Sequence, residues 1–221
     1  MNTDEVKTLI ASRKWYHAFK ILPGVITPGQ SKWNPSPRLN ELNASRDMKN
    51  STALDVGAWD GPLTFEFEKR GADVVATDIQ DPDVTTFNTA KSILKFKANY
   101  IRCSVYDLSN HVPEESIGYL GFFLVYYHLK HPIAAFEQIS SILKPGGMLY
   151  FEGEILANYA ECLDGTRNLD LDIDAMGKSE TPIVLCCPGK FKRGSNWHVP
   201  NLACINSWLR VSGLELSEYT T

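Results

Sequence analysis

From residue 52 onward, short apolar runs alternate with segments in which apolar residues recur every three or four positions. The runs have the length and composition of buried strands. They are "TALDV" (52–56), "DVVATD" (73–78), "YIRCSV" (100–105), "YLGFFLV" (119–125), "MLYFEGEI" (148–155) and "LELSEY" (214–219). The periodic segments have the spacing of amphipathic helices and cover 62–71, 84–97, 132–143 and 200–213. This alternation predicts an α/β fold with a doubly wound, mostly parallel sheet and helices on both of its faces.

Two regions depart from this alternation. A helix is predicted over 3–20, but proline and glycine then break the pattern, so residues 1–50 are expected to form an N-terminal cap or lid segment. The main domain is expected to cover residues 51–221. Within it, residues 157–196 lack regular periodicity, and we expect an insertion that lies over the active site.

Composition narrows the class of protein. The chain has 221 residues, 43% of them hydrophobic, and a formal net charge of −4, which disfavours a surface-wide nucleic-acid footprint. The longest apolar run, 119–129, is too short to span a bilayer, and the first residues lack the pattern of a signal peptide. Five cysteines without a C-x-x-C pair imply neither a disulfide framework nor a zinc site. We therefore expect a cytoplasmic protein with no metal and no membrane partner.

The stretch "DVGAWDG" (55–61) lies between a predicted strand and a predicted helix. Gly57 permits a sharp turn and the close approach of a ligand, and Gly61 opens the helix. The G-x-x-x-G spacing differs from the G-x-G-x-x-G of pyrophosphate-binding loops. A carboxylate at Asp55 suits a cationic group, and Asp78, at the next strand end, suits ribose hydroxyls. The loop is therefore predicted to hold an amino-acid-like cofactor that carries a nucleoside, with a structural turn as the alternative.

These residues resemble motif I and the acidic second-strand end of class I S-adenosylmethionine (SAM) dependent methyltransferases, which have a Rossmann-like sheet. "RCSVYDL" (102–108) and "LKPGGMLYFEGE" (143–154) are similar to later parts of the same fold. The resemblance implies SAM as the cofactor and S-adenosylhomocysteine (SAH) as its product. The residues expected to bind the cofactor are Asp55, Gly57, Ala58, Trp59, Gly61, Asp78, Ile79, Ser104, Val105 and Phe123.

Over residues 13–216 the chain also resembles the subgroup around the tRNA wobble-uridine (5-hydroxyuridine) carboxymethyltransferase, including the opening "WYH…PG…TPG" at 15–29. The arginine that suits a carboxylated cofactor in that enzyme falls on Gly194 here, next to Arg193. We therefore prefer ordinary SAM to carboxy-SAM. The fold usually has a seventh strand, for which this chain leaves no residues after 214–219, so an open sheet edge and a homodimer are expected.

The acceptor side is expected at the end of the fourth predicted main-domain strand. Tyr127 matches the tyrosine of an "LYH" motif in the subgroup, and His128 is the first candidate for a general base. His198, in "NWHVP", is the second candidate. Ordinary core packing is the alternative for each aromatic residue and histidine. The residues expected to contact the acceptor are Trp15, Tyr16, His17, Glu152 and Trp197.

The function expected from these features is transfer of a methyl group from SAM to an oxygen or nitrogen acceptor on a small molecule, such as a natural-product or sugar intermediate. A tRNA-modifying (carboxy)methyltransferase is the alternative within the class. The first fifty residues contain eight basic and four acidic side chains, and this basic region together with "KFKR" (190–193) would suit a phosphate-bearing acceptor. Outside the class, the alternatives are an NAD-dependent oxidoreductase and a SAM-binding protein without turnover.

Overall fold

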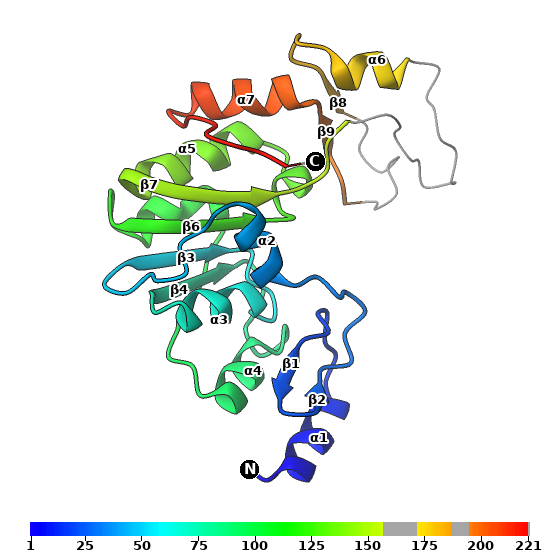
Figure 1. Cartoon of the computed structure of the whole chain (residues 1–221), viewed down its shortest axis with the longest axis vertical. Helices are drawn as coiled ribbons and strands as arrows, with labels where there is room; N and C mark the ends of the chain where they lie inside the picture. The colour runs from blue at the N-terminus through cyan, green and yellow to red at the C-terminus, as the bar shows by residue number, and fades with distance from the viewer. Residues whose placement is uncertain (157–171, 187–194, 221) are drawn as a thin grey trace. The chain divides into compact units, whose positions relative to one another are not determined.

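The structure, a computed structural model, describes residues 1–156, 172–186 and 195–220 (Figure 1). Its central feature is a five-stranded sheet with the order β5-β4-β3-β6-β7. The strands are β3 (Thr52–Val56), β4 (Asp73–Asp78), β5 (Asn99–Arg102), β6 (Ile117–Phe123) and β7 (Leu143–Glu152). Strand β3 pairs in parallel with both β4 and β6, and β4 pairs in parallel with β5. The predicted α/β fold is confirmed, and its strand order reverses at β3, where such sheets bind ligands.

Helices connect the parallel strands, as the periodic segments predict. Helix α3 (Pro62–Lys69) follows β3, α4 (Phe87–Leu94) follows β4, and α5 (Pro132–Ile142) precedes β7. Two 3-10 helices, η1 (Val105–Asn110) and η2 (Tyr126–His128), follow β5 and β6. Helix α3 begins with a proline at its first position, where the missing amide hydrogen costs nothing.

The N-terminal region is less helical than predicted. Helix α1 (Thr3–Ala11) ends well before residue 20, and β1 (Lys20–Leu22), β2 (Val25–Ile26) and α2 (Pro35–Glu41) follow. The helix cannot continue because the backbone amides of Tyr16 and His17 donate to the side chain of Asp60 instead of to a preceding turn. This long-range contact is invisible in the local pattern.

The C-terminal region contains elements that the periodicity missed and lacks one that it predicted. The described part of 157–196 includes α6 (Ile173–Lys178) and β8 (Val184–Cys186), and β8 pairs antiparallel with β9 (His198–Pro200). Helix α7 (Leu202–Val211) forms as predicted. The strand predicted at 214–219 is wrong, because that stretch pairs with no strand and most of its side chains are exposed.

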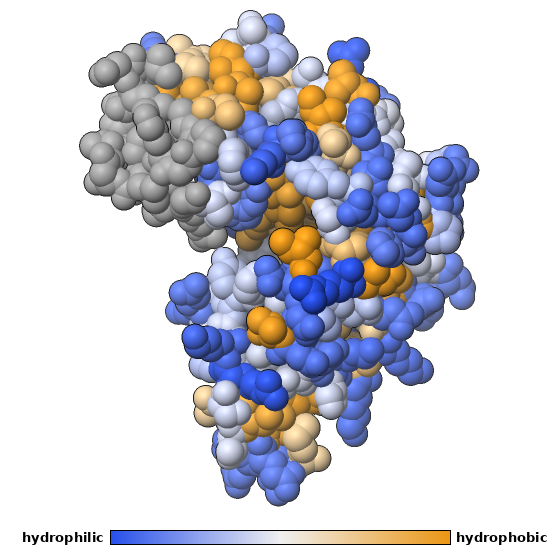
Figure 2. Space-filling model, turned by 180° about the vertical axis from the view of Figure 1, so that it is seen from behind, coloured by the Kyte–Doolittle hydropathy of each residue, from blue (hydrophilic) through white to orange (hydrophobic). Residues whose placement is uncertain are grey.

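The chain divides into two compact units, each with its own core. The N-terminal unit consists mainly of residues 1–121 and 142–150, and the C-terminal unit of residues 122–141 and 151–219. In the first, Phe65 packs among α1, α4 and Trp15; in the second, Tyr126 and Phe136 pack on Phe151. On the face drawn in Figure 2, hydrophobic side chains form small groups among polar ones. Within the described ranges, the structure has no helix with the length and apolarity needed to cross a membrane.

Candidate functional site

The loop at 57–61 is folded back against β4. The backbone amides of Gly57 and Ala58 both donate to the carbonyl of Thr77, at 2.8 and 3.1 Å. At Gly61 the backbone has a φ of +91°, and a Cβ there would lie 2.8 Å from the ring of Phe65. Glycine is therefore required at the point where the loop becomes α3.

Asp55 lies at the carboxyl end of β3 and is buried, with 3% of the residue exposed. The hydroxyl of Thr64, in the first turns of α3, donates to its carboxyl at 2.6 Å. Burial raises the pKa of Asp55 to about 7, although the bond from Thr64 lowers it. A cationic group beside this carboxyl would favour its charged form, so the chemistry of the site fits the ammonium of an amino acid.

Asp78 lies at the carboxyl end of the neighbouring strand β4. Its two carboxylate oxygens accept hydrogen bonds from the backbone amides of Trp59, at 3.0 Å, and Gln80, at 2.9 Å. Each oxygen keeps a second lone pair, with which it can accept from a ligand hydroxyl. The next side chain, Ile79, is 61% exposed and offers an apolar surface beside the carboxylate.

The third strand end is formed by residues that follow β5. The amide of Cys103 donates to the carbonyl of Asp78 at 3.0 Å, which holds this chain segment against the end of β4. The hydroxyl of Ser104 accepts from the amide of Tyr106 at 3.2 Å and caps η1, and Val105 is buried. Asp55, Asp78 and Ser104 thus follow one another along the carboxyl edge of adjacent strands. Phe123, the last residue of β6, belongs to the C-terminal unit.

Asp60, in the loop at 57–61, is a residue that the sequence analysis did not single out. It is completely buried, and its carboxylate accepts from the backbone amides of Tyr16 and His17 and contacts the His17 imidazole. The Tyr16 ring also lies 5.7 Å from the ring of Trp59. The 43-residue separation of His17 and Asp60 hides this contact from pattern analysis. The sequence signals that it offers are the "WDG" of the loop and the separate "WYH". By contrast, Trp15 is 7% exposed and packs in the core, so its predicted contact with an acceptor gains no support.

The histidines proposed as bases occupy the C-terminal unit, where η2 and residues 195–199 lie side by side. The amide of Trp197 donates to the carbonyl of Tyr127 at 2.7 Å. The Nδ1 atoms of His128 and His198 lie 3.2 and 3.0 Å from backbone carbonyls. A carbonyl can only accept, so Nδ1 carries the proton and Nε2 is the basic nitrogen of each neutral ring.

Other predicted acceptor residues have structural partners. The Nζ atom of Lys130 lies 4.8 Å from the centre of the Trp197 ring, a cation–π contact. Glu152 is the last residue of β7, and its carbonyl accepts from the amide of Leu124 at 2.7 Å. Tyr126 is fully buried and its hydroxyl donates to the carbonyl of Glu154, which assigns this ring to the core. Gly194 and Arg193 lie outside the described residues.

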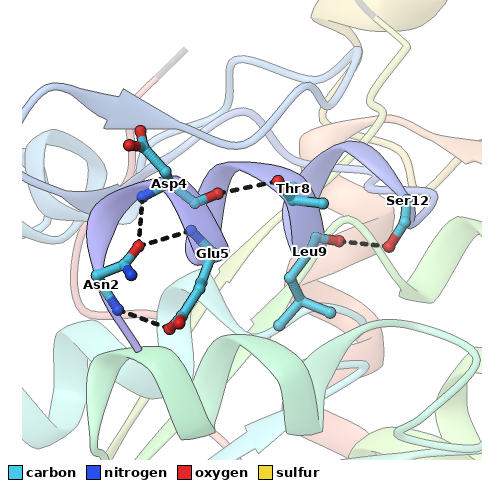
Figure 3. Close-up of a pocket in the computed structure, with 6 residues that line it drawn as sticks. All are labelled: Asn2, Asp4, Glu5, Thr8, Leu9 and Ser12. Carbon is cyan, nitrogen blue, oxygen red and sulfur yellow. Dashed lines mark hydrogen bonds between the residues drawn. The ribbon is translucent and has the colours of Figure 1, made fainter.

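A shallow hollow along α1 is drawn in Figure 3. Its polar groups bond to the helix itself: Asn2 Oδ1 accepts from the amides of Asp4 and Glu5, and Glu5 accepts from the amide of Asn2. This is a capping box, so the hollow is the outer surface of a capped helix end. Among the described residues, His, Cys, Asp and Glu side chains form no cluster that could hold a metal ion.

Comparisons with known proteins agree with this geometry. The model of the family described as "Methyltransferase domain" matches residues 34–185. The chain is 28% identical over 121 residues to a ubiquinone biosynthesis O-methyltransferase of Hydrogenovibrio crunogenus, a match that covers 54% of this chain and 49% of that protein. The chain therefore spans about half the length of this curated relative.

Solved structures show a similar fold. The match to a SAM-dependent methyltransferase from Mesorhizobium loti covers 80% of this chain and 79% of that protein, with a TM-score of 0.59 and 18% identity. The match to the YcgJ protein from Bacillus subtilis covers 80% of this chain and 67% of that protein, with a TM-score of 0.60 and 13% identity. Membership of the wobble-uridine subgroup stays a prediction. The broader prediction of a methyltransferase domain is confirmed by the family match, and the solved structures share its fold. The chain belongs to the methyltransferase domain family.

Proposed function

We propose that the protein transfers a methyl group from SAM to a hydroxyl or amine of a small molecule, such as a natural-product or sugar intermediate. The observation that carries this proposal is the pair of carboxyls at the ends of β3 and β4. Asp55 is buried and poised between its two protonation states, and Asp78 is held by the amides of Trp59 and Gln80. Asp55 lies two residues before the loop at 57–61, and Asp78 follows Thr77, whose carbonyl accepts from the loop amides of Gly57 and Ala58.

The residues fit the parts of SAM by their chemistry. Asp55 would hold the amino-acid ammonium, Asp78 the ribose hydroxyls, and the exposed side chain of Ile79 would cover the adenine. Ser104 and Val105 would border the adenine edge. When bound, SAM supplies an electrophilic methyl group on a sulfonium, and the protein contributes alignment and removal of a proton from the acceptor.

The proton of the acceptor is expected to pass to a histidine. In both His128 and His198 the Nδ1 atom bonds to a backbone carbonyl, so Nε2 is the atom that would take the proton. In both rings this orientation is held by a hydrogen bond to the backbone. His198 also packs its ring 6.1 Å from that of Trp208, which limits its rotation.

Two features favour a small acceptor with a hydroxyl. The net charge of −4 disfavours a tRNA, whose binding depends on neutralising phosphates. The curated relative is named as an O-methyltransferase of ubiquinone biosynthesis, which supports oxygen as the acceptor atom. A tRNA acceptor is therefore the alternative that the experiments must distinguish from a small molecule.

The first test is calorimetric titration of the protein with SAM, SAH, carboxy-SAM and NAD. We expect micromolar binding of SAM and SAH, at least tenfold weaker binding in Asp78→Ala, and no change in Asp73→Ala. Asp73 is a matched control, because it carries the same charge at the exposed opposite end of β4. Binding of NAD alone, or of none of the four, would refute the proposal.

The acceptor is then sought with radiolabelled SAM. Transfer of label into low-molecular-weight compounds, and not into tRNA, is the expected result. The His198→Gln and His128→Gln variants test the base. One of them should lose 10²- to 10⁴-fold in turnover, the usual range for a general base, and keep its SAH affinity. Label in tRNA, or a preference for carboxy-SAM, would support the wobble-uridine alternative instead.

A further inference from the structure

The segment at 15–31 folds onto itself and forms what we call the N-terminal clasp. The amide of Ser31 donates to the carbonyl of Tyr16 at 2.9 Å, and the hydroxyl of Thr27 donates to the carbonyl of His17 at 2.6 Å. At Gly29 a Cβ would lie 2.2 Å from the carbonyl carbon of His17, so only glycine permits this approach. The "WYH…TPG" opening therefore encodes one closed structure.

The clasp is joined to the loop at 57–61 through Asp60. This carboxylate has no exposed surface, and a buried charge is stable only when its oxygens are satisfied. The amides of Tyr16 and His17, at 3.0 and 2.9 Å, and the His17 imidazole supply the donors. His17 is itself 8% exposed, with the ring of Trp33 at 5.9 Å. Release of the clasp would leave the carboxylate of Asp60 without these partners.

Trp59, the neighbour of Asp60, links this contact to Asp78. Its backbone has a φ of +48°, a left-handed conformation that non-glycine residues adopt at a cost. Its ring lies against Tyr16 of the clasp, and its amide donates to the carboxylate of Asp78. A continuous path of contacts thus leads from the clasp through Asp60 and Trp59 to the carboxylate assigned to the ribose.

We propose that Asp60 and His17 are positioning residues that couple the docking of the N-terminal clasp to cofactor binding at Asp78. The inference rests on the proposed function, because it assigns the ribose to Asp78. Coupling between two binding events is reciprocal, so a docked clasp strengthens cofactor binding by the factor by which the cofactor strengthens docking. We expect a factor of about ten, within the usual range of such couplings.

The test compares SAH with its 2′-deoxyribose analogue. Asp60→Ala should weaken SAH binding about tenfold and the analogue by less, so the preference for SAH should shrink. A general loss of stability would weaken the binding of both ligands equally. The matched control is Glu68→Ala, because Glu68 also accepts from two backbone amides, those of Lys97 and Ala98, and lies at the other end of α3. It should leave the preference unchanged.

Two further variants keep the test decisive if Asp60→Ala does not fold. His17→Ala removes the imidazole and retains the carboxylate, and it should shift the ligand preference in the same direction. Asp60→Asn keeps one oxygen for the amides of Tyr16 and His17 and should recover most of the affinity. Hydrogen exchange without ligand adds a direct readout: the amides of Trp59 and Gln80 should exchange faster in His17→Ala than in the wild type.

The outcomes separate the two proposals. If the wild type binds no SAH, the proposed function fails and this inference fails with it. If the wild type binds SAH and the Asp60 and His17 variants keep its affinity and preference, the inference alone is overturned. An equal loss for both ligands, with unchanged exchange at Trp59 and Gln80, would also overturn it. Selective loss of the ribose preference, with faster exchange at those amides, supports it.

Discussion

The hydroxyl of Thr64 donates a 2.6 Å hydrogen bond to the carboxyl of Asp55, and both residues are buried where β3 meets α3. This bond stabilises the ionised form of Asp55, but the loss of water around the carboxyl outweighs it. The negative charge of Asp78 also raises the pKa of Asp55, whereas His17 lowers it. The net result is a pKa of about 7 for Asp55, well above its ordinary value.

This raised pKa predicts a particular dependence of stability on pH. In the folded protein Asp55 binds a proton up to about pH 7, whereas the unfolded chain loses it near 3.8. The folded state therefore holds more protons between these values, and its stability falls as pH rises through this window. Relative to Asp55→Asn, the free energy of unfolding of the wild type should be about 2.5 kcal/mol larger at pH 5 than at pH 8. Urea unfolding at both pH values measures this difference, and parallel changes in the two proteins would contradict it.

The same carboxyl predicts that cofactor binding depends on pH. The ammonium of SAH favours the ionised form of Asp55, so affinity should rise as that form becomes populated. With a pKa of about 7, SAH should bind about tenfold more tightly at pH 8 than at pH 6. Calorimetry at the two pH values checks this, with Asp55→Asn as a control whose weaker affinity should stay flat. A flat profile in the wild type would show that Asp55 does not face the ammonium.

Gly61 is predicted to be intolerant of any side chain. In Gly61→Ala the new Cβ would lie 2.8 Å from Phe65 and 2.9 Å from Phe87, in addition to the strain of a positive φ. Gly146 is a matched control, because its φ is +75° and a Cβ there meets nothing within 4 Å. Gly61→Ala should cost about 2 kcal/mol more in the free energy of unfolding than Gly146→Ala, since only the former overpacks the core. Thermal unfolding of both variants decides, and equal losses would argue against the clash.

Arg70 is predicted to anchor the segment before β3. Its guanidinium donates to Glu66 at 3.1 Å, to the carbonyls of Ala44 and Ser45 at 3.2 and 3.1 Å, and to the side chain of Asn40 at 3.1 Å. Lysine cannot reproduce this planar set of donors, so Arg70→Lys should lower the free energy of unfolding by about 3 kcal/mol.

An exposed ion pair provides the control for Arg70. Lys178 pairs with Asp174 at 2.7 Å, but its side chain is 75% exposed. Lys178→Ala should change the free energy of unfolding by about 0.5 kcal/mol or less. Urea unfolding measures the free energy of unfolding of both variants. Comparable losses would show that the burial of Arg70 does not increase its contribution to stability.

Much of the fold could be predicted from local pattern. The strands at 52–56 and 73–78 were predicted to the residue, because each is a short apolar run bounded by turn residues. The C-terminal helix could be predicted to within two residues at each end from its periodicity, and Asn201 caps it. The strand predicted at 214–219 failed because a strand needs a neighbour, and alternating apolar residues do not supply one.

The candidate site divides in the same way. The glycines of "DVGAWDG", Asp55 and Asp78 were identifiable from sequence, since their spacing along consecutive strands and turns places them at one edge of a parallel sheet. Asp60 and the non-helical course of residues 15–17 were not, because they depend on a contact between segments 43 residues apart. The raised pKa of Asp55 likewise depends on burial that several elements create together.

By itself, therefore, the sequence determined the alternation of strands and helices in the central sheet, the loop that suits a cofactor and the family to which the chain belongs. These features follow from local periodicity and from short motifs whose residues are close along the chain. Only the tertiary structure decided which carboxylate holds the N-terminal clasp, which nitrogen of His128 and of His198 is basic, and that Trp15 belongs to the core. Those properties depend on hydrogen bonds and burial between distant segments, and these arise only when the chain has folded.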